Sequence, residues 1–310
     1  MVHHEIRELT ACDGSAIRTQ FWRPDTPATC VIQVLHGLGE YSDRYGRFAA
    51  AACESGFAVV SHDHRGHGPN AITSGHVDPA SGWRNFSRDA DTVFSAARED
   101  FPKLPVVMLG HSMGSYIAQY FAMHYGGKLA GLILSASTWP MRAQLFPALL
   151  LAKLEKLRLG VRGESRVLYK LGFSNFNKRF EPARTPLDWL SRDNVEVDKY
   201  VADPLCGGPY SCGLWLSLIS GLIRISSDNA LSRIPSDLPI LISGGSMDPV
   251  GGENGMGKLA LHYAQTLHQH LTVKIFEDGR HEMLNDINRD EVTSSWLDWV
   301  ATTTSGGRQG

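Results

Sequence analysis

The chain has 310 residues, of which 43% are hydrophobic and 20% charged, and its formal net charge is −2. This composition supports a sizeable core and excludes a disordered chain. The balanced charge argues against nucleic-acid binding through charge alone, and no apolar run approaches the roughly 18 residues of a membrane-spanning helix. The polar N-terminus has no apolar stretch of the signal-peptide kind. Five cysteines argue against a disulfide framework, so we expect a reduced, cytoplasmic protein. Cys206 and Cys212 flank a short loop that could bring them together, but in a reducing environment we expect them to be free thiols.

Short β-type runs alternate with helical patterns along the chain. Residues 4–9 and 16–22 flank Asp13-Gly14, a hairpin signal. Beyond them we expect strands at 30–35, 57–61, 105–109, 129–134, 239–243 and 272–276, and helices at 44–55, 85–100, 115–125, 258–268 and 290–300. Apolar strands without alternation are buried on both faces, so the sequence predicts an α/β fold with a mostly parallel central sheet flanked by helices.

The alternation of strands and helices stops in the middle of the chain. Residues 139–231 show leucines at helical spacing, scattered Lys and Arg, and several prolines. We therefore predict an α/β core formed by residues 1–138 and 232–301, with residues 139–231 inserted as a helical cap. The last segment, 302–310, has the composition of a flexible tail.

A nucleophile candidate follows the strand predicted at 105–109. Gly110-His111-Ser112-Met113-Gly114 matches the pattern G-x-S-x-G between a strand and a helix, which is the context of a nucleophile elbow. The tight turn needs small residues two positions before and after the serine, and glycine occupies both. We infer that Ser112 is a nucleophile; the alternative is an ordinary glycine-flanked turn.

A serine nucleophile needs a base and an acid that orients the base. Among the later histidines, His262, His268 and His270 lie in or at the end of a predicted helix and are expected at the surface, whereas His281 follows the last strand in a glycine-containing loop. Ligands bind at the carboxyl ends of strands in such sheets, which favours His281. Asp248, just after the strand at 239–243, is the favoured acid, with Asp278, Asp286 and Glu253 as weaker alternatives.

An oxyanion hole requires two backbone N–H donors. The residue after the nucleophile supplies one, which is Met113, and the loop after an earlier strand supplies the other. His36-Gly37-Leu38-Gly39 forms such a loop, and we expect Leu38 to be the second donor.

Three histidines and an aspartate lie close together at His62-Asp63-His64-Arg65-Gly66-His67. A zinc site is one interpretation. The spacing fits no metal motif that we can assign, so we favour a structural turn in which Asp63 and Arg65 hydrogen-bond to neighbouring loops. We expect no metal and no cofactor.

Five segments together resemble the α/β-hydrolase superfamily, and more narrowly its bacterial-type monoacylglycerol lipase and lysophospholipase branch. They are H-G-L-G-E-Y-S-D-R-Y at 36–45, D-H-R-G-H-G at 63–68, G-H-S-M-G at 110–114, G-G-S-M-D-P at 244–249 and G-R-H-E at 279–282. The resemblance implies an α/β-hydrolase fold with an inserted helical cap, and the roles already given to Ser112, Asp248, His281, Leu38 and Met113. The sequence after Asp248, P-V-G-G-E-N-G-M-G, departs from the family pattern in its glycine content, and we expect a mobile loop there.

The cap residues suggest the chemistry of the substrate. Residues 139–160 carry leucines near helical spacing with Lys and Arg between them. This pattern fits a helix that makes transient contact with a membrane surface and guides an acyl chain, and it equally fits a cap helix packed on the core. Phe146, Phe176 and Trp215 are candidate substrate-binding residues, although aromatic side chains are more often simply buried in the core.

The function expected from these features is serine carboxyl-ester hydrolysis through an acyl-enzyme, acting on lipid-like esters of the monoacylglycerol or lysophospholipid type. A thioesterase, amidase or peptidase would use the same three residues, with the cap setting the choice. A non-catalytic binding protein on this fold is disfavoured, because such a protein would usually have lost one of the three.

Overall fold

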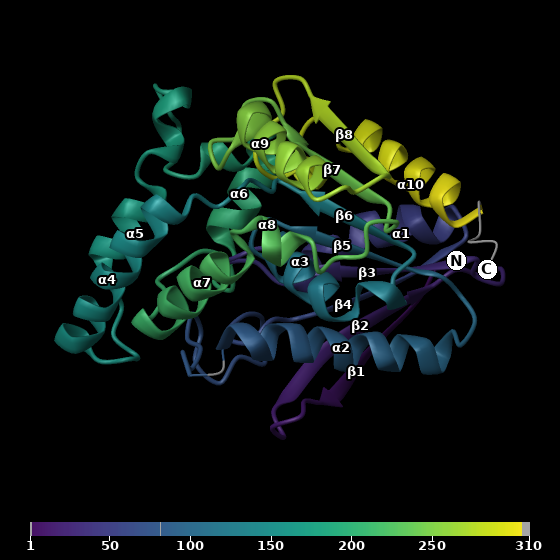
Figure 1. The fold of residues 1–310 in the computed structure, drawn as a ribbon, viewed down its shortest axis with the longest axis horizontal. Helices are drawn as coiled ribbons and strands as arrows, with labels where there is room; N and C mark the ends of the chain where they lie inside the picture. The colour runs from purple at the N-terminus through teal and green to yellow at the C-terminus, as the bar shows by residue number, and fades with distance from the viewer. Residues whose placement is uncertain (1, 81, 306–310) are drawn as a thin grey trace.

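A computed structural model describes residues 2–80 and 82–305 of the chain. Its centre is one eight-stranded sheet in the order β1-β2-β4-β3-β5-β6-β7-β8 (Figure 1). The strands are β1 (His3–Thr10), β2 (Ala16–Arg23), β3 (Cys30–Leu35), β4 (Phe57–His62), β5 (Val106–His111), β6 (Gly131–Ser135), β7 (Ile240–Gly245) and β8 (Leu271–Phe276). β2 pairs antiparallel with both of its neighbours, β1 and β4. All other neighbouring strands, from β4 through β3, β5, β6 and β7 to β8, pair parallel, which confirms the predicted mostly parallel sheet.

The central strands are apolar because helices cover them on both sides. Every residue of β3, β4, β5, β6 and β7 is buried. One face packs against α2 (Gly82–Asp100), α3 (Met113–Tyr125) and α9 (Gly252–Gln265), and the other against α1 (Gly46–Glu54) and α10 (Arg289–Ser305). This arrangement is the α/β-hydrolase fold that the sequence predicts, and it brings the carboxyl ends of the parallel strands to one edge.

The hairpin expected at Asp13-Gly14 is present. β1 and β2 pair over their full length, from His3 opposite Arg23 to Thr10 opposite Ala16. The turn is fixed by the backbone N–H of Gly14, which donates to the carbonyl of Ala11, and glycine suits the turn because its φ is 83°.

The segment between β6 and β7 contributes no strand to the sheet within residues 136–239, all of which the structure describes. It forms α4 (Arg142–Leu159), α5 (Arg166–Phe173), α6 (Asn194–Ala202), α7 (Cys212–Ile225) and α8 (Asp228–Leu231), with short 3-10 helices at Phe176–Phe180 and Asp188–Leu190. α7 packs against α4 on one side and against α2 and α3 on the other. In Figure 1, α4 and α5 form the left edge of the molecule, away from the sheet.

Two boundaries differ from the sequence prediction. The glycine-rich stretch after Asp248 is not a long loop, because α9 already begins at Gly252. A Cβ on Gly255 would lie 2.4 Å from the hydroxyl of Thr138, so glycine allows α9 to approach the segment that follows β6. At the other end, α10 continues to Ser305 rather than ending near residue 301, and the remaining residues of the predicted tail, 306–310, lie outside the described part of the chain.

Candidate active site

Ser112 occupies a strained turn at the carboxyl edge of the sheet. β5 ends at His111 and α3 begins at Met113, so Ser112 alone links strand to helix, with φ 49° and ψ −118°. A Cβ on Gly110 would lie 2.4 Å from the carbonyl oxygen of Gly114, and one on Gly114 would lie 2.0 Å from that of Leu35. Both positions therefore require glycine, as predicted. Such strained serines are held only when the surrounding structure forces the conformation.

Hydrogen bonds hold this turn in place. The backbone N–H of Ser112 donates to the carbonyl of Ser135 on the adjacent β6, at 2.9 Å. The N–H and the hydroxyl of Ser115 both donate to the carbonyl of Ser112, the hydroxyl at 2.6 Å. Ser112 thus lies at the N-terminus of α3, where the helix dipole favours negative charge.

The structure brings Asp248 and His281 together from the loops after β7 and β8. Nδ1 of His281 lies 2.9 Å from Oδ1 of Asp248, and the two residues are only 4% and 3% exposed. Burial alone would lower the pKa of His281, but the charge and hydrogen bond of Asp248 outweigh it and raise the pKa above its usual value. This pairing leaves Nε2 as the ring nitrogen available to another group.

The alternative acids lie in other environments. Asp278 and Glu253 are exposed. Asp286 is fully buried, but it accepts hydrogen bonds from Arg192 and from the backbone of Arg280, so it joins the cap to the loop that carries His281.

The other late histidines are also away from Ser112. His262 stacks on Trp139 and bonds to Asp228, and His270 is exposed. His268 is buried rather than at the surface as expected, because the chain turns back after α9 and packs its ring edge-on against Tyr263.

A buried ionic network that the sequence analysis did not identify joins the loop after β3 to the His281 loop. The carboxylate of Glu40 accepts the N–H of Gly37 at 2.6 Å and the hydroxyl of Tyr45 at 2.8 Å. Arg44 bridges Glu40 and Glu282, donating to Glu282 Oε2 at 2.7 Å. Burial alone would raise the pKa of Glu282, but the charge and hydrogen bonds of Arg44 lower it overall. The signal in the sequence was Glu40, three residues after Gly37.

Two buried histidines support the turns around Ser112. His36 accepts the backbone N–H of His64 at Nε2, so its Nδ1 carries the proton and donates to the carbonyl of Gly37, at 2.7 Å. His111 pairs through Nδ1 with the hydroxyl of Ser135 and lies against the ring of His281. Burial lowers the pKa of each to about 4, so both are neutral at pH 7.

A mainly apolar cavity of about 240 Å³ contains Ser112 and His281. Leu38 and Met113, the expected oxyanion donors, line it. So do Phe176 and Trp215. Phe146 does not, because it lies on the outer face of α4, where it is 51% exposed and packs against Arg142. The remaining wall is largely aromatic and comes from the cap: Tyr169, Phe173, Trp189, Tyr200 and Tyr210.

The cap contacts the His281 loop directly. The N–H of Glu282 donates to the carbonyl of Leu190 at 2.8 Å, and Arg280 donates to the carbonyl of Ser191 at 3.0 Å. The ring of Trp189 lies 5.0 Å from that of His281. The cap therefore excludes water from one side of the imidazole and helps to set the position of its loop.

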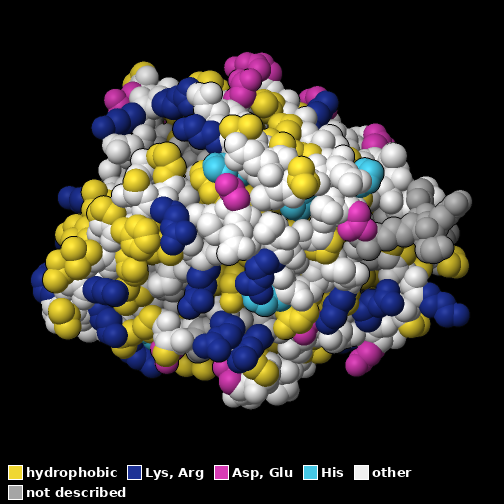
Figure 2. Space-filling view, viewed as in Figure 1, with side chains coloured by type: hydrophobic (Ala, Val, Ile, Leu, Met, Phe, Trp, Pro, Cys, Tyr) yellow, Lys and Arg dark blue, Asp and Glu magenta, His cyan; other side chains and the backbone are white. Residues whose placement is uncertain are grey.

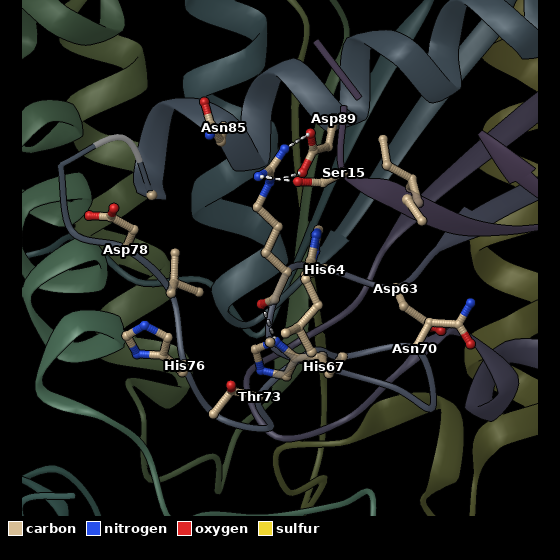
Figure 3. Close-up of a pocket in the computed structure, with 18 of the residues that line it drawn as sticks. Ser15, Asp63, His64, His67, Asn70, Thr73, His76, Asp78, Asn85 and Asp89 are labelled. Atoms are coloured by element: carbon tan, nitrogen blue, oxygen red, sulfur yellow. Dashed lines mark hydrogen bonds and ion pairs between the residues drawn. The ribbon is translucent and has the colours of Figure 1, made fainter. Parts of the chain in front are cut away.

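A second cavity, of about 350 Å³, surrounds the histidine-rich segment after β4 (Figure 3). Arg65 is bonded there to Asp13 and Asp89, which belong to the β1–β2 hairpin and to α2. Asp63 accepts the N–H and the hydroxyl of Ser42 and pairs with Arg18. These bonds confirm the predicted structural turn, in which Asp63 and Arg65 tie neighbouring loops together.

The histidines of this segment form a buried cluster with His36. Ring centroids lie 4.2 Å apart for His36 and His64, and 4.9 Å apart for His62 and His64. Burial lowers the pKa of His62 and of His67 to about 3. Within residues 2–80 and 82–305, no group of three or more His, Cys, Asp or Glu is placed to hold a metal ion, so the zinc interpretation has no support in this geometry.

Two further expectations concern the cysteines and membrane-spanning helices. The five cysteines all lie in the described part of the chain, and each of them, including Cys206 and Cys212, is free there. No helix in the described part of the chain combines the length and apolar character needed to span a membrane.

The fold and this cavity define the class of protein, an α/β-hydrolase. The family described as "Serine aminopeptidase, S33" matches residues 26–288, and the chain belongs to this family. A monoglyceride lipase from Homo sapiens is 29% identical over 98% of this chain and 92% of its own length, and a monoacylglycerol lipase from Mycolicibacterium smegmatis is 28% identical over 93% and 94%. The crystal structure of a thermostable carboxyl esterase from Bacillus coagulans has a TM-score of 0.87 and 26% identity, covering 97% of this chain and 99% of that one. These matches confirm the predicted monoacylglycerol lipase branch and place the chain among the carboxylic ester hydrolases.

Proposed function

We propose that this chain hydrolyses lipid-like acyl esters, of the monoacylglycerol or lysophospholipid type, through a covalent acyl-enzyme on Ser112. The observation that carries the proposal is the cavity in which the strained Ser112 and the buried Asp248–His281 pair meet an apolar, aromatic wall. A serine on such a turn, a histidine and a carboxylate are the three groups that acyl transfer requires.

Acylation begins when Ser112 Oγ attacks the ester carbonyl and its proton passes to Nε2 of His281. The carbonyl oxygen becomes an oxyanion, which the N–H groups of Leu38 and Met113 stabilise. Asp248 holds Nδ1–H of His281 and stabilises the imidazolium. When the carbon–oxygen bond to the alcohol breaks, His281 returns the proton to the leaving oxygen, and the alcohol departs.

Deacylation repeats these steps with water. His281 takes a proton from the water molecule as its oxygen attacks the acyl carbon, and the same two N–H groups hold the second oxyanion. The bond to Ser112 Oγ then breaks, the proton passes from His281 to Oγ, and the carboxylic acid leaves.

The lining of the cavity favours an acyl ester over a peptide. An aminopeptidase needs a carboxylate that is free to bind the substrate ammonium. The two carboxylates that line this cavity near Ser112, Glu40 and Glu282, are already bonded to Arg44 and to a backbone N–H. The aromatic wall instead offers contacts to an acyl chain. The monoglyceride lipase relatives point to a glycerol ester as the substrate to try first.

The experiment is hydrolysis of p-nitrophenyl esters from acetyl to palmitoyl, and of a monoacylglycerol, by the wild type and by Ser112→Ala. Loss of the serine should reduce kcat by on the order of 10⁶, while Ser174→Ala, an exposed serine in the cap, is a matched control that should keep full activity. Because 240 Å³ lies below the usual ~300–1,000 Å³ of ligand cavities, we expect a chain-length optimum shorter than palmitoyl. Hydrolysis of thioesters or amides without any ester hydrolysis would overturn the ester assignment, and activity retained by Ser112→Ala would overturn the nucleophile.

The position of Phe146 gives an internal control for the acyl site. Trp215→Ala enlarges the cavity and should move the chain-length optimum to longer esters. Phe146→Ala should leave the optimum unchanged, because this side chain lies outside the cavity. Equal shifts in both variants would contradict the assignment of this cavity to the acyl chain.

A further inference from the structure

The outer face of the cap carries an unusual stripe of exposed apolar side chains. On α4, Phe146, Leu150, Leu154 and Leu157 follow one another at helical spacing and are 51%, 60%, 53% and 83% exposed. On the next helix, α5, Val167 and Leu171 are exposed one turn apart. Leucines are normally buried, so a contiguous apolar face of this kind marks an interaction surface.

The same face is strongly basic although the chain as a whole is slightly acidic. Residues 141–171 contain seven Lys and Arg but only two Asp and Glu. One of the two, Glu155, is buried and bonded to Arg158 and Ser165. Lys153, Lys156, Arg166 and Lys170 make no ion pair within residues 2–80 and 82–305, so their charges are free to attract an anion. Figure 2 shows this side, at the left, with hydrophobic and basic side chains interspersed.

This face adjoins the cavity that contains Ser112. Tyr169 and Phe173 of α5 line the cavity, while Val167 and Leu171 of the same helix point into solvent. Tyr169 is itself 38% exposed, which places it at the rim. A long-chain molecule that leaves a lipid surface against α5 would therefore reach the cavity without crossing open water.

We propose that the outer face of α4 and α5 binds anionic lipid surfaces in preference to neutral ones. The leucines enter the boundary between headgroups and acyl chains, and the four unpaired basic side chains meet lipid phosphates, as in other interfacial helices. The preference for an anionic surface goes beyond the proposed hydrolysis. From the proposed function, this proposal takes only the assumption that the substrate is lipid-like. A second copy of this chain is a poor occupant, because two faces of the same positive charge repel each other.

The test is flotation of the Ser112→Ala protein with vesicles, so that no lipid is hydrolysed. Phosphatidylcholine vesicles are compared with vesicles in which about one third is phosphatidylglycerol. We expect strong binding to the anionic vesicles, weakened by salt, and much weaker binding to the neutral ones. Equal binding to both would overturn the proposal, as would self-association through this face in analytical ultracentrifugation.

Paired variants separate the two contributions. Lys153→Gln with Lys156→Gln should lower partitioning into anionic vesicles about 30-fold, since each basic residue contributes about fivefold. Leu154→Ser with Leu157→Ser should lower partitioning into both kinds of vesicle at least tenfold. Leu261→Ser, at an exposed leucine on α9, is the control and should change nothing. Unchanged binding in both double variants would refute the assignment of this face.

The proposal and the proposed function fail separately. In an otherwise wild-type chain, the four substitutions should leave hydrolysis of a water-soluble short-chain ester unchanged, because none of these side chains lines the cavity. Failure of ester hydrolysis in the wild type would refute the proposed function without affecting the flotation result. Absence of vesicle binding by the Ser112→Ala protein, together with full ester activity in the wild type, would refute only the proposal that this face binds a lipid surface.

Discussion

Asp248→Asn is the substitution that tests the candidate site most directly. The change keeps the shape of the side chain and removes its charge. In the wild type, Oδ1 of Asp248 lies 2.9 Å from Nδ1 of His281 and also accepts the N–H of Val250. The amide oxygen can keep one of these bonds, so the loop after β7 should stay folded while His281 loses its anionic partner.

Two effects follow from the loss of charge. First, the imidazolium formed during acyl transfer is no longer stabilised and the ring tautomer is no longer fixed, which typically lowers kcat by about 10⁴. Second, the acid limb of the pH–rate profile moves. A base must be neutral to act, so wild-type activity falls as the pH drops through the raised pKa of His281. Without the charge of Asp248, less opposes the effect of burial on His281. The pKa of His281 therefore falls, and the acid limb of the pH–rate profile moves to lower pH.

The assay is the pH dependence of kcat/KM on a short p-nitrophenyl ester, with circular dichroism to confirm folding. Glu253→Gln and Asp278→Asn are matched controls. Glu253 follows β7, as Asp248 does, and Asp278 follows β8, as His281 does, but both carboxylates are exposed. Near-wild-type activity in Asp248→Asn, together with loss of activity in either control, would show that another carboxylate is the acid. A limb that moves to higher pH would refute the electrostatic argument.

Two further predictions concern stability. Arg44→Met leaves the buried carboxylates of Glu40 and Glu282 without their cation, which should destabilise the fold by about 3–5 kcal/mol. Adding Glu282→Gln to this variant should raise its melting temperature again in part, and equal melting temperatures for the single and double variants would contradict this reasoning. The buried histidine cluster should make the fold less stable in acid. The pKa values of His36, His62 and His67 are lowered to about 4, 3 and 3 in the folded protein, whereas histidines in the unfolded chain titrate near 6.5. Below about pH 6.5 the unfolded chain therefore binds more protons than the folded one. The free energy of unfolding should fall by up to about 1.4 kcal/mol per pH unit for each buried histidine between about pH 6 and pH 4.5; urea unfolding measures it, and a free energy independent of pH would refute it.

The parts of the fold and site that the sequence predicts are those with strong local signals. The apolar runs at 30–35 and 57–61 become β3 and β4 almost residue for residue, because a fully buried strand has no polar face to obscure it. Gly110 and Gly114 could be predicted because a side chain at either position would collide with backbone, at Gly110 with the start of α3 and at Gly114 with the end of β3. Asp248 and His281 follow from the rule that polar groups at the carboxyl ends of strands converge.

The parts that escaped prediction depend on contacts between distant segments. Arg44 and Glu282 are 238 positions apart, and neither is unusual among charged residues until the fold brings them together. Phe146 and Phe176 look alike in the sequence, yet one lies outside on α4 and the other in the cavity. α4 has leucines both on its exposed side and on the partly buried side that packs against the core, so the leucine pattern alone does not show which face points inward. His268 is buried rather than exposed because the turn after α9 packs it against Tyr263, a contact that the helical pattern of the sequence does not reveal.

The distribution of charge also determines how the molecule would approach a lipid surface. Because residues 141–171 carry a basic excess while the net charge is −2, the rest of the chain carries an acidic excess. An anionic surface therefore attracts the cap and repels the remainder, which orients the molecule before any leucine touches lipid. In that orientation α5 presents Val167 and Leu171 to the surface and Tyr169 and Phe173 to the cavity. The placement of one helix between solvent and Ser112 thus connects the long-range field of the protein to the path of the acyl chain.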